Sequence, residues 1–320
     1  MKNSLLVACS LLTLPLLSDD AAFSFWGDVA FFRRAEGNNR RLIIDEGGGK
    51  LNPCGSCNYH SCETKKLVRD FHYEPGFETG IRYMTRHSIF EARYLWIRQW
   101  ESSCHKSDIG LLYFSEDHPD LTVDFSGADE AQAIYQSQFQ NGEINYYWFI
   151  SPRHENYFSA GWLFGIRYEN IVEHINVEFQ NGSDKSPYRV HVSNHLPVIQ
   201  TGGELGWNPT TYLSWDLTLK IGLGFDWYRQ HTYLGDRNNT VTLLNYDASG
   251  FSTPFVAEAA LALTYQPWRF INIHAAYSMI YFNGVALAPD QIHKSLKHQI
   301  ARAIGSPIYH GWTAGVTFSF

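Results

Sequence analysis

The sequence lacks, beyond its N-terminal segment, any apolar run long enough to cross a bilayer as a helix, which takes about 18 residues or more. This absence excludes a helical membrane protein. Charge is also scarce, since Asp, Glu, Lys and Arg make up 18% of the chain. The net charge of −7 argues against a nucleic-acid partner, which selects for Lys and Arg. Aromatic residues are abundant instead, at 16%, with 10 Trp and 19 Tyr.

The N-terminus has the features of an export signal. Lys2 supplies a positive charge, Leu5 to Leu17 form an apolar stretch, and small residues follow up to Ala22. We therefore expect residues 1–22 to be a signal peptide that is removed. A lipoprotein signal ending at Cys9 is disfavoured, because only about four apolar residues precede that cysteine, against roughly 7–15 in an ordinary signal. Export without a spanning helix leaves a soluble secreted protein or a membrane β-barrel.

Side chains alternate between apolar and polar over unusually long stretches. Between 211 and 228 one face carries Leu213, Trp215, Leu217, Leu219, Ile221, Leu223, Phe225 and Trp227, and the other face carries small and polar residues. Similar alternation occurs at 77–83, 160–169 and 311–320. A soluble β-sandwich also alternates, but its strands are usually about 5–6 residues long, and its polar face is not rich in glycine. The pattern favours a closed antiparallel transmembrane β-barrel with lipid on the apolar face.

The expected barrel has about ten strands and forms a single domain over residues 23–320. The strands are placed at 23–34, 71–85, 88–101, 131–150, 156–180, 187–207, 211–229, 253–266, 269–283 and 309–320. The connections between them are alternately long and short, which is typical of long extracellular loops and short periplasmic turns in the bacterial outer membrane. One more hairpin within 107–126 would give twelve strands. A two-residue turn at Arg86 and His87 predicts that Arg82 faces Glu91 inside the barrel.

Several segments resemble the putative β-barrel porin-7 family of bacterial outer-membrane proteins. The clearest is the segment Tyr281–Gln291, and weaker matches occur at 77–83, 91–94, 142–145 and 165–168. The resemblance implies an outer-membrane barrel and implies little about activity. The cysteine-rich segment 54–62 has no counterpart in it.

Charged residues of both signs fall on the face predicted to line the lumen. They are Glu78, Arg82, Glu91, Arg93, Arg167, Glu169, Glu204, Asp216, Lys220, Asp226 and Glu258. A barrel of about ten strands is narrow and largely filled by side chains. A paired interior that stabilises the barrel is therefore favoured over a selective path for small solutes, although such a path stays open.

Four cysteines remain after the signal peptide: Cys54, Cys57, Cys62 and Cys104. All four fall in connections on the extracellular side, and an oxidising compartment favours disulfides, with three pairings open. The alternative is a zinc site that includes His60. The disulfide interpretation is preferred, and we expect no metal and no cofactor.

The expected function is that of an integral outer-membrane protein, porin-like or structural, without enzymatic activity. A hydrolase would need an acid–base or nucleophilic unit, and the rim candidates His105, Asp108, His231, Asp236 and His310 show no spacing that forms one. A surface receptor or adhesin built from the extracellular segments is the other alternative. In it, 290–303 has apolar residues at helical spacing, which favours a short amphipathic helix packed at the barrel mouth.

The expected partners are outer-membrane lipid and the outer-membrane insertion machinery. The last residue, Phe320, is similar to the terminal aromatic that serves as the assembly signal of bacterial outer-membrane barrels.

Overall fold

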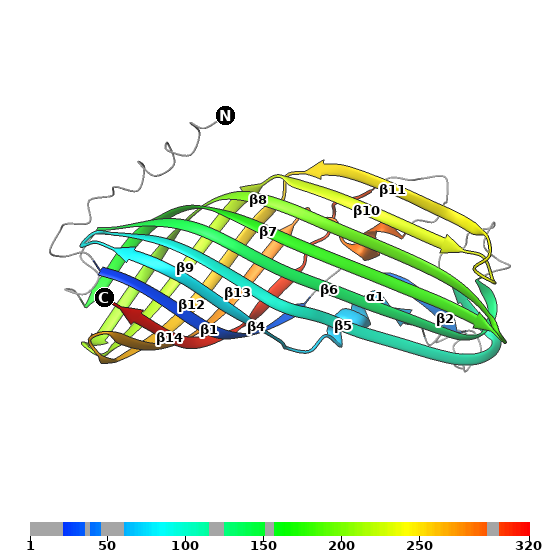
Figure 1. The fold of residues 1–320 in the computed structure, drawn as a ribbon, viewed down its shortest axis with the longest axis horizontal. Helices are drawn as coiled ribbons and strands as arrows, with labels where there is room; N and C mark the ends of the chain where they lie inside the picture. Colours follow the sequence, from blue (N-terminus) through cyan, green and yellow to red (C-terminus); the bar gives the residue numbers. More distant parts are fainter. Residues whose placement is uncertain (1–21, 36–38, 46–60, 115–124, 151–156, 293–300) are drawn as a thin grey trace, which may run out of the picture.

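The computed structural model describes residues 22–35, 39–45, 61–114, 125–150, 157–292 and 301–320, and it consists almost wholly of antiparallel strands (Figure 1). The strands are β1 (Ala22–Ala35), β2 (Arg41–Asp45), β3 (Cys62–Glu63), β4 (Glu74–Met84), β5 (Ser88–Phe114), β6 (Ser126–Phe149), β7 (Phe158–Asn181), β8 (Asp184–Thr210), β9 (Leu213–Gly224), β10 (Asp226–Gly235), β11 (Thr242–Ser252), β12 (Phe255–Trp268), β13 (Ile271–Asn283) and β14 (Ile308–Ser319). A six-residue helix, α1 (Thr64–Arg69), and a 3-10 turn, η1 (Ala288–Gln291), complete the fold. The expected signal peptide lies outside the described residues, except for Ala22 at the start of β1.

Ten strands close into a ring in the order β8, β7, β6, β5, β4, β1, β14, β13, β12 and β9, and β9 pairs with β8 to complete it. The first and last strands pair from Ser24 with Ser319 to Ala35 with Ile308. Closure gives the backbone polar groups of every strand a neighbour to bond, which a membrane-spanning sheet requires. The expected closed antiparallel transmembrane barrel is therefore confirmed. The stretch 107–126 lengthens β5 and β6, as far as it is described, and does not add a hairpin to the ring.

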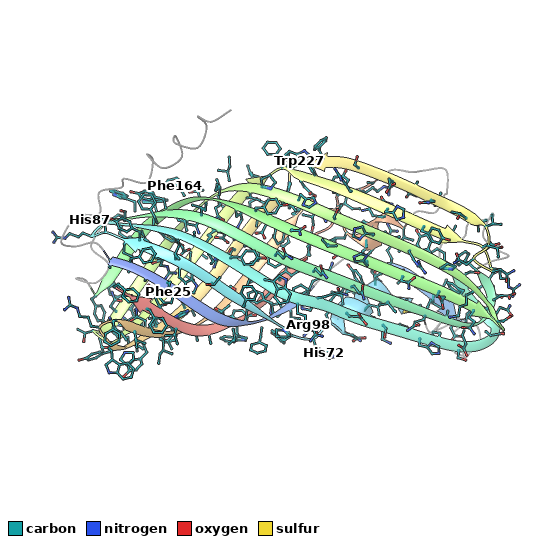
Figure 2. All side chains as sticks on the ribbon, in the orientation of Figure 1. Phe25, His72, His87, Arg98, Phe164 and Trp227 are labelled. Atoms are coloured by element: carbon teal, nitrogen blue, oxygen red, sulfur yellow. The ribbon has the colours of Figure 1, made fainter. Side chains whose placement is uncertain are left out.

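The outer surface at one end of the barrel carries a continuous apolar band, which is the lipid-facing surface. The row predicted on the segment 211–228 lies on it: its members from Leu217 to Trp227 are exposed, by 37% at Leu217 to 68% at Leu223, and Leu213 and Trp215 are partly buried. Phe164 and Trp227 project from the same surface (Figure 2). Within the described ranges, no helix is long and apolar enough to cross a membrane.

Half of the ring continues far beyond the band as a curved sheet, which we call the wall (Figure 1). It comprises residues 100–114 of β5, 126–139 of β6, 170–181 of β7 and 184–196 of β8, together with β10 and β11. By contrast, β1, β4, β13 and β14 have 11 to 14 residues and end near the band. The long loops predicted at 102–130, 181–186 and 230–252 are wrong in this respect, since strands run through most of their described residues. The reason is that in water a strand needs no apolar outer face, so the lipid pattern stops while the hydrogen-bonded ladder goes on.

The inner face of the wall is covered by an apolar core. Residues from the wall meet two segments that fold against it: the region of β2, β3 and α1, and residues 284–292, which we call the mouth segment. Core residues include Trp100, Tyr135, Phe139, Ile175, Val177, Phe179, Val190 and Val192 from the wall, and Leu42, Leu67, Val68, Val285, Leu287 and Ile292 from the inner segments. Of the amphipathic helix expected at 290–303, residues 293–300 lie outside the described part, and η1 begins before it at Ala288.

Candidate functional site

A cluster of buried charges fills the lumen at the level of the apolar band. Glu143 and Glu258 are its two central carboxylates, and their side chains are 0% and 1% exposed. Lys220 Nζ lies 2.8 Å from Glu143 and 3.1 Å from Glu258. Arg167 contacts both carboxylates at once. We call Arg93, Glu143, Arg167, Lys220 and Glu258 the charge cluster.

One contact of the charge cluster crosses the full width of the barrel. Arg93 Nη2, on β5, lies 2.5 Å from Glu143 and 3.0 Å from Glu258, on β12. Strands β5 and β12 are opposite each other, because four strands separate them in either direction around the ring. The lumen is therefore bridged from wall to wall by direct ion pairs.

A second layer lies between the charge cluster and the short turns. Arg82 Nε lies 2.6 Å from Glu91 Oε2, and the two residues are direct partners across β4 and β5, so the predicted contact is confirmed. The Arg82 guanidinium also stacks over Trp26, 4.5 Å from the ring centroid. Gly80 makes room for that indole, since a Cβ there would lie 2.3 Å from Trp26 Cη2. Tyr147 donates a hydrogen bond of 3.2 Å to Glu91 and helps to fill this end.

A third layer closes the lumen on the extracellular side. Arg34 Nη2 lies 2.7 Å from Glu173, and Tyr135 donates to the same carboxylate at 2.8 Å. Glu173 also accepts a hydrogen bond of 2.9 Å from the backbone N–H of Ala288, in η1. A buried carboxylate thus joins β1, β6 and the mouth segment.

The mouth segment is held in place by Asn194 of β8. Its side-chain amide donates to the carbonyl of Ala286 at 2.8 Å and accepts from the N–H of Ala286 at 2.9 Å. Residues 285–292 are all buried. The segment Tyr281–Gln291, which carried the family resemblance, therefore ends inside the barrel mouth and plugs it.

The structure places all of the charged residues predicted to line the lumen on the inner face of the strands. Glu78, Arg93, Arg167, Glu169, Lys220 and Glu258 belong to the charge cluster or touch it. Glu204, Asp216 and Asp226 are buried elsewhere in the interior. Sequence reasoning did not include Glu143, the residue with most partners. The sequence did contain a signal for Glu143: it lies next to Ile144, which is exposed on the lipid face, and neighbouring residues of a strand face opposite sides.

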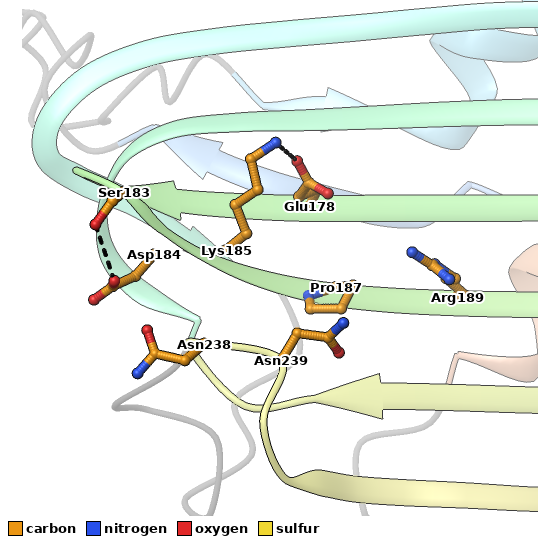
Figure 3. Close-up of a pocket in the computed structure, with 8 residues that line it drawn as sticks. All are labelled: Glu178, Ser183, Asp184, Lys185, Pro187, Arg189, Asn238 and Asn239. Atoms are coloured by element: carbon orange, nitrogen blue, oxygen red, sulfur yellow. Dashed lines mark hydrogen bonds and ion pairs between the residues drawn. The ribbon is translucent and has the colours of Figure 1, made fainter.

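A polar pocket of about 270 Å³ lies at the far tip of the wall, between the β7–β8 turn and the β10–β11 turn (Figure 3). We call it the rim pocket. It is lined by Glu178, Ser183, Asp184, Lys185, Pro187, Arg189, Asn238 and Asn239. Lys185 is paired with Glu178 at 2.7 Å.

Hydrogen bonds to Asp236 hold the β10–β11 turn beside the rim pocket in one conformation. Asp236 accepts hydrogen bonds from the N–H groups of Thr240 and Val241 at 2.6 and 3.0 Å, and these bonds lower the pKa of its carboxyl. Asn239 adopts a left-handed conformation with φ of 51°, which Asn tolerates better than most residues. The β7–β8 turn at 181–183 and the β10–β11 turn at 238–240 consist of polar residues and glycine, and together they form one surface of fixed shape.

The other rim candidates are spread over the molecule. His231 contacts Asp247 at 3.0 Å, and His310 contacts Tyr277 at 2.9 Å. Asp236 braces a turn, as described above. His105 lies beside Cys104, and the side chain of Asp108 lies outside the described part. The described side chains among these candidates do not converge on one site.

Of the four cysteines, the structure describes Cys62 and Cys104, both as free thiols. They line a common pocket of about 250 Å³ together with Lys66, Asp70 and Lys106. Cys54, Cys57 and His60 lie outside the described residues. Among the described residues, no three His, Cys, Asp or Glu side chains are grouped so as to hold a metal ion.

Phe320 lies on the outer surface at the seam of the barrel. Its backbone exchanges two hydrogen bonds with Phe23, with N···O distances of 2.8 and 3.1 Å. Its ring stacks with Phe25, at 5.9 Å between centroids. Its role as an assembly signal stays a prediction.

Comparison with known proteins gives matches among solved structures. No family model matches the chain, and no curated protein matches it in sequence. The outer membrane protease OmpT from Escherichia coli matches with 9% identity and a TM-score of 0.45, over 97% of this chain and 99% of that one. The translocator domain of the autotransporter NalP from Neisseria meningitidis matches with 11% identity and a TM-score of 0.35, over 93% and 88% of the two chains.

A third match is Ail, the attachment invasion locus protein of Yersinia pestis, with 8% identity and a TM-score of 0.25, over 93% of this chain and 99% of that one. These structures are similar to this chain as outer-membrane β-barrels. No family model supports membership of the porin-7 family, and the fold shows the broader class, a closed transmembrane β-barrel.

The expectation that the chain has no enzymatic activity is corrected by these matches, because an outer membrane protease is among them. The absence of a recognisable catalytic spacing in the sequence was therefore an insufficient ground for that expectation. At 9% identity and a TM-score of 0.45 the likeness assigns no reaction to this chain.

Proposed function

We propose that this protein is a surface receptor or adhesin of the outer membrane, in which a closed barrel anchors the wall and its rim. The observation that carries the proposal is the ion pair between Arg93 and Glu258, which spans the barrel from β5 to β12. A general-diffusion pore keeps a water-filled path at this level. Here the path is occupied by paired charges, which are costly to separate once buried.

Two further layers support the same proposal. The contacts of Arg82 with Trp26 and Glu91 fill the end near the short turns, and the mouth segment fills the extracellular end. Opening a path would require three separate sets of contacts to rearrange together. The small-solute path considered from the sequence is thus the less favoured function.

The surface that remains for binding is the wall and the rim pocket. The rim pocket presents Arg189, Asp184 and two asparagine side chains, so it offers both hydrogen-bond donors and acceptors (Figure 3). A polar partner with both kinds of group fits it better than an apolar one. Rigid turns lower the ordering cost of binding.

Planar-bilayer recording on purified, detergent-refolded protein tests the closed barrel. The wild type should insert and give no discrete conductance steps, whereas a general-diffusion porin measured in parallel should give them. The double variant Arg93→Ala with Glu258→Ala removes one charge of each sign and the cross-lumen pair, but it leaves the Arg82 layer and the mouth segment in place, so it should give no steps either. Stable steps from the wild type would refute the proposal.

Binding at the rim is tested on cells that display the protein. Cells should adhere to one or more surfaces of an array of glycans and extracellular-matrix proteins. The variant Arg189→Ala with Asn239→Gly should lose this adhesion while the barrel still folds. The matched control is Gln136→Ala, which lies on the wall away from the pocket. Equal adhesion by rim variant and wild type would contradict a binding role for the rim pocket.

A further inference from the structure

Two cysteines that are far apart in the sequence meet on the inner face of the wall. Cys62 is fully buried in β3, and Cys104 is half-buried on β5. Their thiols are hydrogen-bonded to each other, and both line the same solvent-connected pocket. The side chain of Ser102 is also on the inner face, whereas Ser103 is exposed, as the alternation along a strand requires.

The surroundings make Cys104 the more reactive thiol. The hydrogen bond from Cys62 lowers the pKa of Cys104 to about 7, and Lys106 and Lys66 act in the same direction. The same hydrogen bond, in which Cys62 is the donor, raises the pKa of Cys62, and burial raises it further. A half-exposed thiolate beside a buried thiol is the arrangement in which thiol–disulfide exchange begins at the exposed member.

The two cysteines belong to segments that are otherwise held by packing and a few strand contacts. Cys62 precedes α1, whose Leu67 and Val68 are buried in the apolar core. Strand β3 pairs with β2, and β2 pairs with the end of β5 through Ile43 and Phe114. A covalent link at this point would fasten the inner segment to the wall directly.

We propose that Cys62 and Cys104 form a disulfide in the mature protein and that this bond fastens the segment of β3 and α1 to β5. The Cys104 thiolate attacks the disulfide of a protein thiol oxidase and releases one of its sulfurs as a thiolate. Cys62 then loses its proton and attacks the mixed disulfide at Cys104. The new bond joins Cys62 and Cys104, and the oxidase disulfide is reduced to a dithiol. Both the periplasm and the cell surface are compartments in which such bonds persist.

The test uses the full chain with Cys54→Ser and Cys57→Ser. Cys62 and Cys104 are then the cysteines that remain once the expected signal peptide, which contains Cys9, has been removed. Outer membranes are quenched with acid, which stops thiol–disulfide exchange, and are then dissolved at neutral pH in denaturant that contains an alkylating reagent. The protein is mapped by mass spectrometry. The expected result is a cross-linked pair of peptides containing Cys62 and Cys104, with no alkylated thiol. After reduction, both should be alkylated. Two alkylated thiols without reduction would overturn the proposal.

A matched control moves one thiol to the other face of β5. The variant Cys104→Ser with Ser103→Cys, in the same background, should give two alkylated thiols and no cross-link. Mapping of the wild type decides the pairing among all four cysteines, and a bond from Cys62 to Cys54 or Cys57 would also overturn the proposal. The unfolding midpoint is then compared with and without reduction. It should fall on reduction in the Cys54→Ser, Cys57→Ser protein and not in the control, because the bond fastens the segment of β3 and α1 to β5. An unchanged midpoint would refute this stabilising role of the bond.

Discussion

Strand β7 passes through two regions of the molecule in which the same alternation has opposite polarity. In the apolar band, Ile166 and Tyr168 face outward and Arg167 and Glu169 face the lumen. In the wall, outward positions such as His174 are polar, and inward positions such as Val177 belong to the apolar core. The period of two is unchanged, because it belongs to the backbone. The polarity changes because the outer solvent changes from lipid to water.

The comparison explains why the interior is filled differently in the two regions. Where lipid covers the outside, the inside can be polar, and the charge cluster satisfies its own charges by pairing. Where water covers the outside, stability must come from burying apolar side chains against the inner segments. The boundary lies between Tyr168 and Asn170 on β7, and between Pro197 and His195 on β8.

The largest expected effect is in the charge cluster. Replacing Glu143 with Ala removes one of the two central carboxylates that Arg93, Arg167 and Lys220 contact, and removing one partner of a buried ion pair typically destabilises by about 3–5 kcal/mol. The measurement is urea unfolding in detergent, followed by the shift between the folded and unfolded bands on a gel. Glu178→Ala in the exposed pair with Lys185 is the control and should change the unfolding free energy little. Equal effects would mean that the cluster does not stabilise the barrel.

The core of the wall should respond almost as strongly. Phe179 is 1% exposed and packs against Phe114 and Phe125. Replacing it with Ala should lower the unfolding free energy by about 3–5 kcal/mol, the usual range for a large core side chain. Its outward neighbour, changed as Gln180→Ala, should have a small effect. If the two variants unfold alike, the wall has no apolar core.

A lysine on the lipid face should be destabilising, and one on the outer face of the wall should not. Leu219→Lys, in the apolar row of β9, should lower the unfolding free energy by about 2–4 kcal/mol in lipid vesicles. Ser193→Lys, on the outer face of β8 beyond the band, should change it by less than about 0.5 kcal/mol. The reverse order would place the membrane around the wall.

The smallest expected effect is a pH dependence from two histidines on the wall. His174 and His191 are direct partners across β7 and β8, with ring nitrogens 3.0 Å apart, and burial lowers the pKa of both. At a pH between the lowered folded pKa values and the unfolded pKa, the unfolded state therefore binds more protons than the folded state. The stability they allow is complete above the unfolded histidine pKa of about 6.5, and it is lost as the pH falls through the lower folded values. The variant His174→Gln with His191→Gln should flatten the dependence of the unfolding midpoint between about pH 7 and 5, and an unchanged slope would contradict this.

The ring of strands could be predicted from the sequence because lipid imposes a strong pattern. The row from Leu213 to Trp227 and the turn at Arg86 and His87 gave the right faces and the right register. The wall was predicted only in part: the strands placed at 131–150, 156–180 and 187–207 reach into it, whereas residues 102–114 of β5 and most of β10 and β11 were predicted as loops. In those segments a polar outer face in water does not differ clearly from a loop. Similarly, the partners of Glu143 come from β5, β7 and β9, and no local spacing indicates which inward charges meet across a lumen.

The positions of the inner segments could not be predicted from local sequence patterns either. Asn194 holds Ala286 through contacts between residues 92 positions apart. The proximity of Cys62 and Cys104, which line one pocket, depends on how α1 packs against the wall, and the sequence pattern does not contain this information. The sequence shows that these residues can form hydrogen bonds or disulfides, and only the fold shows which of them come into contact.

The most direct test of the change of solvent along the barrel is a spin-label scan of the outward positions of β7, from Trp162 to Glu178, in a background without cysteine and in lipid vesicles. Labels up to Tyr168 should collide preferentially with oxygen, which concentrates in lipid, and labels from Asn170 onward should collide preferentially with a water-soluble nickel complex. A scan in which the nickel complex reaches every position equally, or in which oxygen is preferred up to Glu178, would contradict a barrel that leaves the membrane between Tyr168 and Asn170.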